Sequence, residues 1–522
     1  MYFKIFVNPS KFRLNAIIFA AFNLIFRPVF CQEINEFFRL KNSDNLFITT
    51  GFTEVNGKSY GIGISVDSVN QSFFNIFNFG SKKKIEIEYS MALENSYNYI
   101  QFTPPKIDKL NRLFHAFSME NSNIGRNGKF IIFDSKSGLL IDSVYLSPHK
   151  TGFSSAVQKP DSTFLLFGTS TEFDPNGDFY LMHVGKNGEF ISDTTYGHTA
   201  FEERGYAIAA TPDGGFVFTG MRRTTLNSVI KFRSKIAVYK IDAKGAVEWS
   251  NLYGGDLYNV PYQIKVAEDS NIYIVGLGSS KTTTTENYFN DSPYLLKLLK
   301  NGKQYSFNLD TNYNQGLPLL GKYSNLLIEG KKKYCLANWY YFIDRDKSPT
   351  NPSSIHFFND DSLVWKRYLF SFTEPESSHE LYSIEKTLDG GFLMGGTIEG
   401  KAPDPVGQYG WIVKTDSLGC VVPGCHLVGV PNLQGQIESN MLVYPNPSNN
   451  AQNTWLSFAL PKTEAVTVTV TNLNGQAVKQ KDFGLLPKGN HQMQMDITLA
   501  SGIYFIKLQT PTLRETVKWV VE

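Results

Sequence analysis

The chain has 522 residues, too many for one ordinary hydrophobic core, so its length predicts several domains or an array of repeats. It carries 50 Lys and Arg against 48 Asp and Glu, and this near-neutral balance excludes the cationic surface that nucleic acid requires. Aromatic residues make up 14% of the chain, with 41 Phe and 27 Tyr, which favours strands and tight turns over helices. The composition predicts an all-β protein.

Residues 1–31 have the pattern of a secretory signal peptide. Basic residues precede LNAIIFAAFNLIF (14–26), an apolar run of 13 residues that is shorter than a membrane span. We expect cleavage next to Cys31, and the alternative is a retained membrane anchor. No other segment is apolar for long enough to cross a membrane, so the mature chain is predicted to have no transmembrane segment.

A short pattern recurs along the body of the chain: an aspartate, two turn residues, an apolar strand, and a glycine seven residues after the aspartate. An aspartate side chain caps a tight turn, and a glycine accepts the positive φ that such turns need. A second turn in the same repeats also ends in glycine. The copies of the first pattern are DGGFVFTG (213–220), DGGFLMGG (389–396), 44–51, 161–168 and 269–276, with degenerate copies at 111–118 and 331–338.

Seven copies predict a repeat architecture in which each unit is a four-stranded antiparallel meander. Four short strands per unit are typical of a propeller blade, so residues 32–430 are predicted to form a seven-bladed β-propeller. The alternative is an open β-solenoid, which requires separate capping repeats. The repeats resemble the blades of SBBP-type and pyrroloquinoline-quinone-type bacterial propellers, with DGGFVFTG…YKIDAKGAVEWSNLYGG as the fullest match. This resemblance implies a fold alone.

The cysteines fit a protein that is exported. Cys420 and Cys425 flank a Pro-Gly turn and are predicted to form a small disulfide loop in an oxidising compartment. The alternative is a metal site that includes His426, which would need further ligands. Cys335 is expected to be a buried strand residue.

The tail is predicted to be a separate domain. Residues 431–440 read as a linker, and residues 441–522 alternate in a way that predicts a small Ig-like β-sandwich. LVYPNPSNN (442–450), VTVTNLNGQAV (468–478), LASGIYFIKLQ (499–509) and VKWVVE (517–522) resemble the type A C-terminal sorting domain of type IX secretion. Gln476 departs from the family, which usually has Arg there. The matching residues are Tyr444, Pro445, Asn446, Pro447, Gly475, Gly502, Tyr504 and Lys518.

The sorting-domain resemblance has implications for partners and location. It implies that the chain meets the type IX secretion machinery and its sortase-like peptidase, crosses the outer membrane of a Gram-negative cell, and is released or attached to surface lipopolysaccharide.

Sequence motifs for catalysis are missing, so we expect no cofactor and no metal. DPNGD (174–178) has oxygen ligands at alternate positions but lacks the distal glutamate of a calcium loop, which favours a plain turn. Lys240, Lys297, Lys414 and His183 recur five residues before a turn glycine. They would either grip an anionic ligand or pair with the turn aspartates, and we favour the pairing.

The segments that enter each repeat vary most, and variable loops on a rigid scaffold are where ligands usually bind. They predict a ligand rim that includes Glu203, Arg204, His379 and Glu380. The function that we expect is a non-enzymatic binding or adhesion module for an extracellular glycan or protein. Two alternatives are a secreted glycan-active hydrolase using rim carboxylates about 5 to 10 Å apart and a structural component of the envelope.

Overall fold

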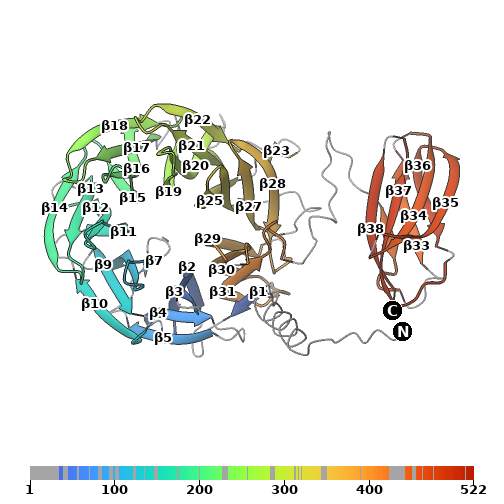
Figure 1. Ribbon diagram of the computed structural model, residues 1–522, viewed down its shortest axis with the longest axis horizontal. Helices are drawn as coiled ribbons and strands as arrows, with labels where there is room; N and C mark the ends of the chain where they lie inside the picture. The colour runs from blue at the N-terminus through green and yellow to red at the C-terminus, as the bar shows by residue number, and fades with distance from the viewer. Residues whose placement is uncertain are drawn as a thin grey trace, which may run out of the picture. The chain divides into compact units, whose positions relative to one another are not determined.

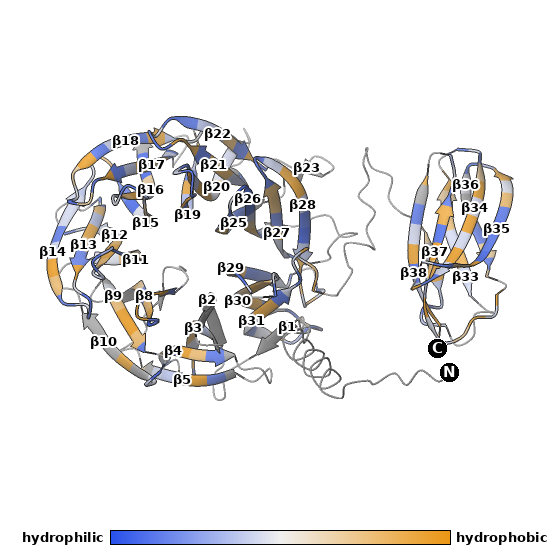
Figure 2. Cartoon of the chain, in the orientation of Figure 1, coloured by the Kyte–Doolittle hydropathy of each residue, from blue (hydrophilic) through white to orange (hydrophobic). Residues whose placement is uncertain are grey.

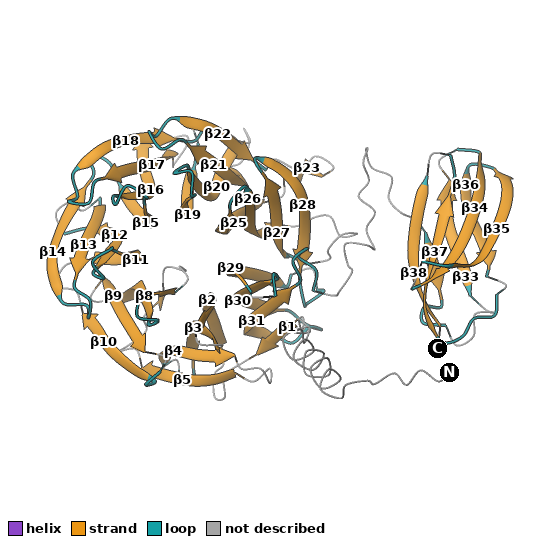
Figure 3. Ribbon diagram, in the orientation of Figure 1, coloured by secondary structure: helices purple, strands orange, loops and turns teal. Residues whose placement is uncertain are grey.

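The computed structural model describes most of the chain as two compact units, residues 1–421 and 422–522. The described ranges are 34–38, 45–55, 58–69, 71–79, 85–92, 98–99, 105–121, 125–134, 136–145, 151–172, 176–198, 200–225, 233–255, 257–282, 289–310, 313–314, 317–318, 320–341, 350–374, 376–387, 389–421, 441–448, 454–460, 462–473, 475–495, 497–511 and 513–521. Within these ranges the chain forms strands, turns and loops without a helix (Figure 3). No helix in the described part could therefore cross a membrane.

The first unit consists of antiparallel sheets in chain order, most of them four-stranded meanders as the repeats predict. Sheet 1 contains β2 (Asn45–Val55), β3 (Lys58–Val66), β4 (Ser72–Phe79) and β5 (Ile85–Ala92). Sheet 2 contains β6 (Asn98–Tyr99), β7 (Lys106–Ile107), β8 (Leu113–Asn121), β9 (Gly125–Asp134) and β10 (Leu139–Tyr145). Sheet 3 contains β11 (Thr151–Gln158), β12 (Phe164–Ser170), β13 (Asp178–Val184) and β14 (Phe190–Tyr196).

The same arrangement continues along the chain. Sheet 4 contains β15 (Glu203–Ala210), β16 (Phe216–Thr225), β17 (Arg233–Ile241) and β18 (Val247–Tyr253). Sheet 5 contains β19 (Asn259–Val266), β20 (Ile272–Thr282), β21 (Phe289–Leu298) and β22 (Gln304–Leu309), and a small hairpin of β23 (Tyr313–Asn314) and β24 (Leu317–Pro318) follows it. Sheet 6 contains β25 (Leu320–Glu329), β26 (Lys332–Tyr341), β27 (Ser353–Asn359) and β28 (Ser362–Leu369).

Sheet 7 joins the two ends of the first unit. It contains β29 (Ser378–Lys386), β30 (Phe392–Gly400), β31 (Gly407–Thr415) and, beside β31, the N-terminal strand β1 (Ile34–Phe38). The antiparallel register runs from Ile34 opposite Lys414 to Phe38 opposite Gly410. A strand from the start of the unit thus completes the last sheet.

The sheets of the first unit are arranged as a ring (Figure 1). The first strands β11, β15, β19, β25 and β29 lie nearest the centre, and β14, β18, β22 and β28 lie at the periphery (Figure 1). Apolar residues from adjacent sheets pack together; one such cluster joins Phe167 of sheet 3 to Phe218 of sheet 4, whose ring centroids are 4.7 Å apart. Figure 2 shows apolar residues interspersed with hydrophilic residues along the strands of the ring. The all-β, propeller-like fold is confirmed, and inter-sheet packing is its core.

The turn chemistry predicted from the repeat is confirmed. Oδ1 of Asp213 accepts a hydrogen bond from the backbone N–H of Gly215 at 3.0 Å, and Asp389 accepts the matching bond from Gly391 at 3.1 Å. Gly214 and Gly390 adopt φ of +86° and +83°. The second turn behaves alike, since its glycines also have positive φ: Gly138, Gly188, Gly245, Gly302 and Gly419.

The glycine that ends the repeated pattern is required by close backbone approach. A β-carbon on Gly396 of β30 would lie 2.7 Å from Cα of Leu381 in β29 and nearer still to the carbonyl oxygen of Glu380. A β-carbon on Gly168 would similarly lie 2.8 Å from Cα of Phe153 in the adjacent inner strand. The inner strand therefore approaches more closely than any side chain allows.

One copy of the pattern takes a different position in its sheet. The copies that begin at residues 161, 213, 269, 331 and 389 lead into the second strand of a sheet, and the copy at 111 leads into β8, which pairs with the short β6 and β7. The copy at 44–51 instead lies on β2, the first strand of sheet 1. The second strand there is β3, from Lys58. Short apolar strands next to turn residues look alike in sequence, whichever position in the sheet they take.

The second unit is a small β-sandwich. One sheet contains β32 (Leu442–Tyr444), β33 (Trp455–Leu460) and β36 (Gly489–Gln494), and the other contains β35 (Ala477–Leu486), β34 (Glu464–Asn472), β37 (Gly502–Gln509) and β38 (Arg514–Val521). The predicted alternation is confirmed on β34, where Val466, Val468 and Val470 are buried and the intervening threonines are partly exposed. Trp519 is fully buried in the core of this unit.

Several predictions concern residues outside the described ranges. The signal peptide 1–31 and the linker 431–440 lie there, as does Cys425. Cys420 is disulfide-bonded, while its pairing with Cys425 stays a prediction. Cys335 is confirmed as a buried free thiol on β26, and burial raises its pKa.

Candidate functional site

A β-bulge interrupts the inner strand of successive sheets. In β15 the register shifts between Gly205 and Ala207, and in β19 it shifts between Pro261 and Gln263. A bulge turns the extra residue out of the ladder and is common beside functional sites. The extra residues all stand seven positions before the first residue of the repeated pattern: Ser154, Tyr206, Tyr262, Ser324 and Tyr382.

The bulges bring a set of aromatic and charged side chains into contact. The rings of Tyr206 and Tyr262 meet edge to face, with centroids 5.7 Å apart and an interplanar angle of 85°. The ammonium group of Lys322 lies 5.6 Å from the centroid of Tyr262. It also lies 3.6 Å from Oε2 of Glu380, which accepts a hydrogen bond of 2.6 Å from the hydroxyl of Tyr382. We call these five residues the tyrosine cluster.

The tyrosine cluster spans the inner strands of four consecutive sheets, β15, β19, β25 and β29, which lie near the centre of the ring (Figure 1). Four of its side chains are half-buried, and Tyr382 is buried. Tyr294 of β21 is fully buried, and its pKa is raised by burial and by the neighbouring Tyr262 and Tyr206 hydroxyls. The arrangement combines aromatic surface with one cation and one anion, as ligand-binding pockets do.

A second charged group lies at the opposite ends of the inner strands. Burial and the nearby Lys265 lower the pKa of Lys106 to about 7, while Glu385 raises it in part. Burial raises the pKa of Glu385, and the two lysines oppose that rise. Lys106 donates a hydrogen bond of 2.6 Å to the carbonyl of Ala156 on the next inner strand. These charges come from sheets 2, 5 and 7 and influence one another electrostatically.

Two of the predicted rim residues occupy one equivalent position of the repeat. Glu203 and His379 both stand ten residues before a turn aspartate, as do Thr151 and Asn259. All four are buried, with at most 1% of each residue exposed. At this position Asn259 donates to the carbonyl of Ser234 at 2.8 Å, which ties the start of β19 to sheet 4. The side chains of Asn259, Glu203 and His379 each bond to backbone groups of the segment that precedes their inner strand.

Glu203 is held in a buried polar cluster. Its Oε1 accepts a hydrogen bond from Nε of Arg222, and its Oε2 accepts one of 3.2 Å from the backbone N–H of His198. Arg222 also donates to the hydroxyl of Tyr239 at 2.6 Å. Burial raises the pKa of Glu203 to about 7, although Arg222 opposes the shift, and the carboxylate of Asp178 adds to it. The pKa of the Glu203 carboxyl therefore lies near neutral pH, although the side chain is buried.

His379 is likewise enclosed. Its Nε2 accepts hydrogen bonds of 3.0 Å from the backbone N–H groups of Ser371 and Phe372, and its Nδ1 donates one of 3.0 Å to the carbonyl of Asn351. These bonds fix the neutral ring, and burial lowers its pKa to about 4.

The other two predicted rim residues are more accessible. Arg204 is exposed and pairs with Glu202 at 2.9 Å, whereas Glu380 belongs to the tyrosine cluster. The four predicted residues thus take different places. Glu203 and His379 are buried where their inner strands begin, Arg204 is exposed, and Glu380 lies at the candidate site.

The three repeated lysines pair with carboxylates, as favoured from the sequence, whereas the ring of His183 bonds to the hydroxyl of Thr163 at 2.8 Å. Lys240 lies 3.2 Å from Asp213, and Lys414 pairs with Asp389. Lys297 pairs at 2.9 Å with Asp361 of sheet 6, a partner that differs from the aspartate of its own repeat. Among the residues described, no group of three or more His, Cys, Asp or Glu could hold a metal ion.

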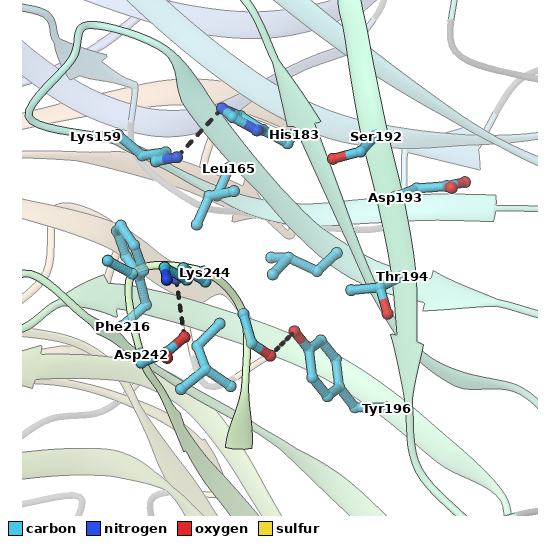
Figure 4. Close-up of a pocket in the computed structure, with 14 residues that line it drawn as sticks. Lys159, Leu165, His183, Ser192, Asp193, Thr194, Tyr196, Phe216, Asp242 and Lys244 are labelled. Carbon is cyan, nitrogen blue, oxygen red and sulfur yellow. Dashed lines mark hydrogen bonds between the residues drawn. The ribbon is translucent and has the colours of Figure 1, made fainter. Parts of the chain in front are cut away.

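A pocket of about 340 Å³ lies between sheets 3 and 4 (Figure 4). Lys159, His183, Ser192 and Tyr196 come from sheet 3, and the turn with Asp242 and Lys244 closes the opposite side. Nothing in the sequence analysis predicted this pocket, because it depends on two adjacent sheets.

The predicted sorting residues lie in turns and strands of the second unit. Asn446 bridges to β38: its Nδ2 donates to the carbonyl of Lys518 and its Oδ1 accepts from the N–H of Val520, both at 2.8 Å. The hydroxyl of Tyr504 donates to the carbonyl of Ala500 at 3.0 Å, and Gly475 adopts a φ of +75° in its turn. The YPNP motif is thereby fastened to the last strand.

Comparison with known proteins identifies the tail. Residues 442–522 match the family described as "Secretion system C-terminal sorting domain". No curated protein matches the chain.

Solved structures with a similar fold include an ulvan lyase of polysaccharide lyase family PL25, with 8% identity, 74% of this chain and 96% of that chain covered, and a TM-score of 0.48. A protein of unknown function from Dyadobacter fermentans has 9% identity, 73% and 98% coverage, and a TM-score of 0.43. An α-L-arabinanase from Penicillium chrysogenum has 8% identity, 64% and 99% coverage, and a TM-score of 0.38.

The family match identifies residues 442–522 as a type IX secretion C-terminal sorting domain, which indicates export of the protein to the cell surface or the extracellular space.

Proposed function

We propose that the protein is an exported seven-bladed β-propeller that binds an extracellular glycan at the tyrosine cluster. Each of sheets 1 to 7 would be one blade, and β1 would close the ring beside β31. The propeller would occupy residues 32–430, after removal of residues 1–31 and before the linker at 431–440. The sorting domain would deliver the folded propeller through the type IX machinery and its sortase-like peptidase.

The observation that carries the proposal is the continuous contact between Tyr206, Tyr262, Lys322 and Glu380 across adjacent inner strands. The electron-rich face of a tyrosine ring suits the C–H face of a sugar ring. The ammonium and carboxylate groups can bond hydroxyl groups of the same sugar, which fixes its orientation. Because rigid strands hold the side chains, little entropy is lost on binding.

The test compares inner with outer tyrosines. Tyr206→Ala and Tyr262→Ala should each weaken glycan binding by at least tenfold in calorimetric titrations with ligands chosen from a glycan array. Tyr305→Ala is the matched control, because Tyr305 lies on the outer strand β22 and is 62% exposed. Equal affinities of all three variants and the parent would contradict the proposal, provided that their melting temperatures agree.

The alternative function is a secreted glycan-active hydrolase. The raised pKa of Glu203 favours this alternative, because a carboxyl group with a pKa of about 7 can act as a general acid. The same titrated samples should be assayed for shortened glycans. Turnover that Glu203→Gln abolishes while binding remains would establish the enzyme and overturn the binding-only function. No turnover with intact binding would leave Glu203 a structural residue.

A further inference from the structure

The pocket between sheets 3 and 4 is open to solvent and has an apolar floor. Leu165 and Leu181 of sheet 3 and Phe216 and Ile241 of sheet 4 form the floor. Figure 4 shows Ser192, Thr194 and Tyr196 of β14 on the side of the turn that carries Asp242 and Lys244. Asp193 points away from that turn and accepts a hydrogen bond of 2.6 Å from the hydroxyl of Tyr180. The hydroxyl of Tyr196 donates a hydrogen bond of 2.8 Å to the carbonyl of Gly245, which ties the two walls together.

The next junction around the ring has the same construction without the opening. The hydroxyl of Tyr253 on β18 donates to the carbonyl of Gly302, just as Tyr196 does to Gly245. Between these walls, the indole of Trp249 packs on the turn of sheet 5: a β-carbon on Gly302 would lie 2.9 Å from Cε3 of Trp249. A tryptophan of the chain therefore occupies the gap between sheets 4 and 5.

The strand register identifies what replaces this tryptophan in sheet 3. Trp249 pairs with Lys240, and Ser192 pairs with His183. Lys240 and His183 each stand five residues before the glycine of their turn, so Ser192 and Trp249 hold equivalent positions.

The missing ring leaves open space beside the turn of sheet 4. A β-carbon on Gly245 would meet only the hydroxyl of Tyr196, at 3.2 Å. The junction between sheets 6 and 7 again contains a tryptophan, since a β-carbon on Gly419 would lie 2.9 Å from Cη2 of Trp365. Two junctions are thus filled by an indole from the chain, and the junction at Ser192 has a pocket instead.

We propose that the pocket binds a planar aromatic ring of indole size from another molecule, in the place that Trp249 takes between sheets 4 and 5. The apolar floor supplies the contact surface, and the volume lies within the range of small-ligand sites. The four floor residues carry no charge, so a neutral ring suits this contact surface best. This site is separate from the tyrosine cluster, which lies on the inner strands.

The test measures binding of 5-fluoroindole to the purified full-length protein by ¹⁹F NMR. The expected dissociation constant is below about 1 mM, which a ligand of this size can reach. Ser192→Trp should fill the pocket and weaken binding at least tenfold, and Ser192→Ala should leave it within twofold. Contacts between indole protons and the Leu181 methyl groups, measured in the parent protein, locate the ring without any variant.

The outcomes are distinct. Absence of binding by the parent, or unchanged binding by a folded Ser192→Trp, would overturn the proposal, as would indole contacts away from Leu181. Acetyl-tryptophanamide distinguishes the source of the ring: binding equal to that of 5-fluoroindole indicates a tryptophan of a partner protein, and binding of 5-fluoroindole alone indicates a free small molecule. Methyl glucoside should not compete, because its ring is neither planar nor aromatic, and competition by it would contradict an aromatic site.

Discussion

Two glycines of one repeated segment, Gly390 and Gly396 in DGGFLMGG, should respond very differently to alanine. A β-carbon on Gly390 meets nothing within 4 Å, so Gly390→Ala adds only the cost of a φ of +83°. That cost is about 1 to 2 kcal/mol, and the stiffer unfolded chain offsets part of it. The expected net loss of stability is about 1 kcal/mol.

Gly396→Ala should cost much more, because its β-carbon would lie 2.7 Å from Cα of Leu381 and closer to the carbonyl oxygen of Glu380. Both obstacles are backbone atoms, so β29 itself has to move. Overpacking of this kind costs about 3 kcal/mol or more. Since Glu380 and Tyr382 flank Leu381, the movement should also weaken glycan binding at the tyrosine cluster.

Differential scanning calorimetry of the parent and both variants measures this contrast. For a unit of this size, about 2 °C of melting temperature corresponds to 1 kcal/mol, so Gly396→Ala should lower the first unit's transition by about 6 °C and Gly390→Ala by about 2 °C. The transition of the second unit should stay in place and serves as the internal control. Equal shifts of the two variants, or a larger shift for Gly390→Ala, would refute the role assigned to close backbone approach.

Two further predictions concern other parts of the chain. Burial lowers the pKa of His379 to about 4, so the histidine of the unfolded chain takes up a proton at a higher pH than that of the folded chain. The free energy of unfolding of the first unit should therefore fall by about 3 kcal/mol as pH falls from about 6.5 to 4. In urea titrations, His379→Gln should reduce this dependence on pH. Asn446→Ala removes two hydrogen bonds to β38 and should destabilise the second unit by about 2 kcal/mol, with reduced surface delivery. Undiminished stability of Asn446→Ala in chemical denaturation would show that the YPNP motif does not fasten the tail.

The repeat and its turns were predictable because they depend on local chemistry. An aspartate capping a turn and a glycine at positive φ act within a few residues, as at Asp213 and Gly214. The alternation of Val466, Val468 and Val470 likewise reports burial directly. The position of 44–51 on the first strand of its sheet was not predictable, because turn residues and apolar strands do not specify the position of a strand in its sheet.

The candidate sites were harder to predict because they arise between sheets. A signal for the tyrosine cluster does exist: Tyr206, Tyr262 and Tyr382 each stand seven residues before a turn aspartate. Their meaning depends on the bulge, which the one-dimensional pattern does not display. The chemistry of Glu203 and His379 predicts ligand-rim residues, yet their spacing of ten residues from the turn aspartates places both at the buried position where the inner strand begins.

The pairing of β1 with β31 has a consequence for the order in which the ring can be assembled. Ile34 lies opposite Lys414, so the first strand of the unit to be synthesised acquires its neighbour only when the last strand has been made. Until then β1 presents unpaired backbone groups, and once β31 has been made both strands do so until they pair with each other; such groups are prone to pair with other chains. Joining partners so distant in sequence is also slow, since a long loop has to close first. A chaperone that covers these two edges before export would address the period of greatest risk for this protein.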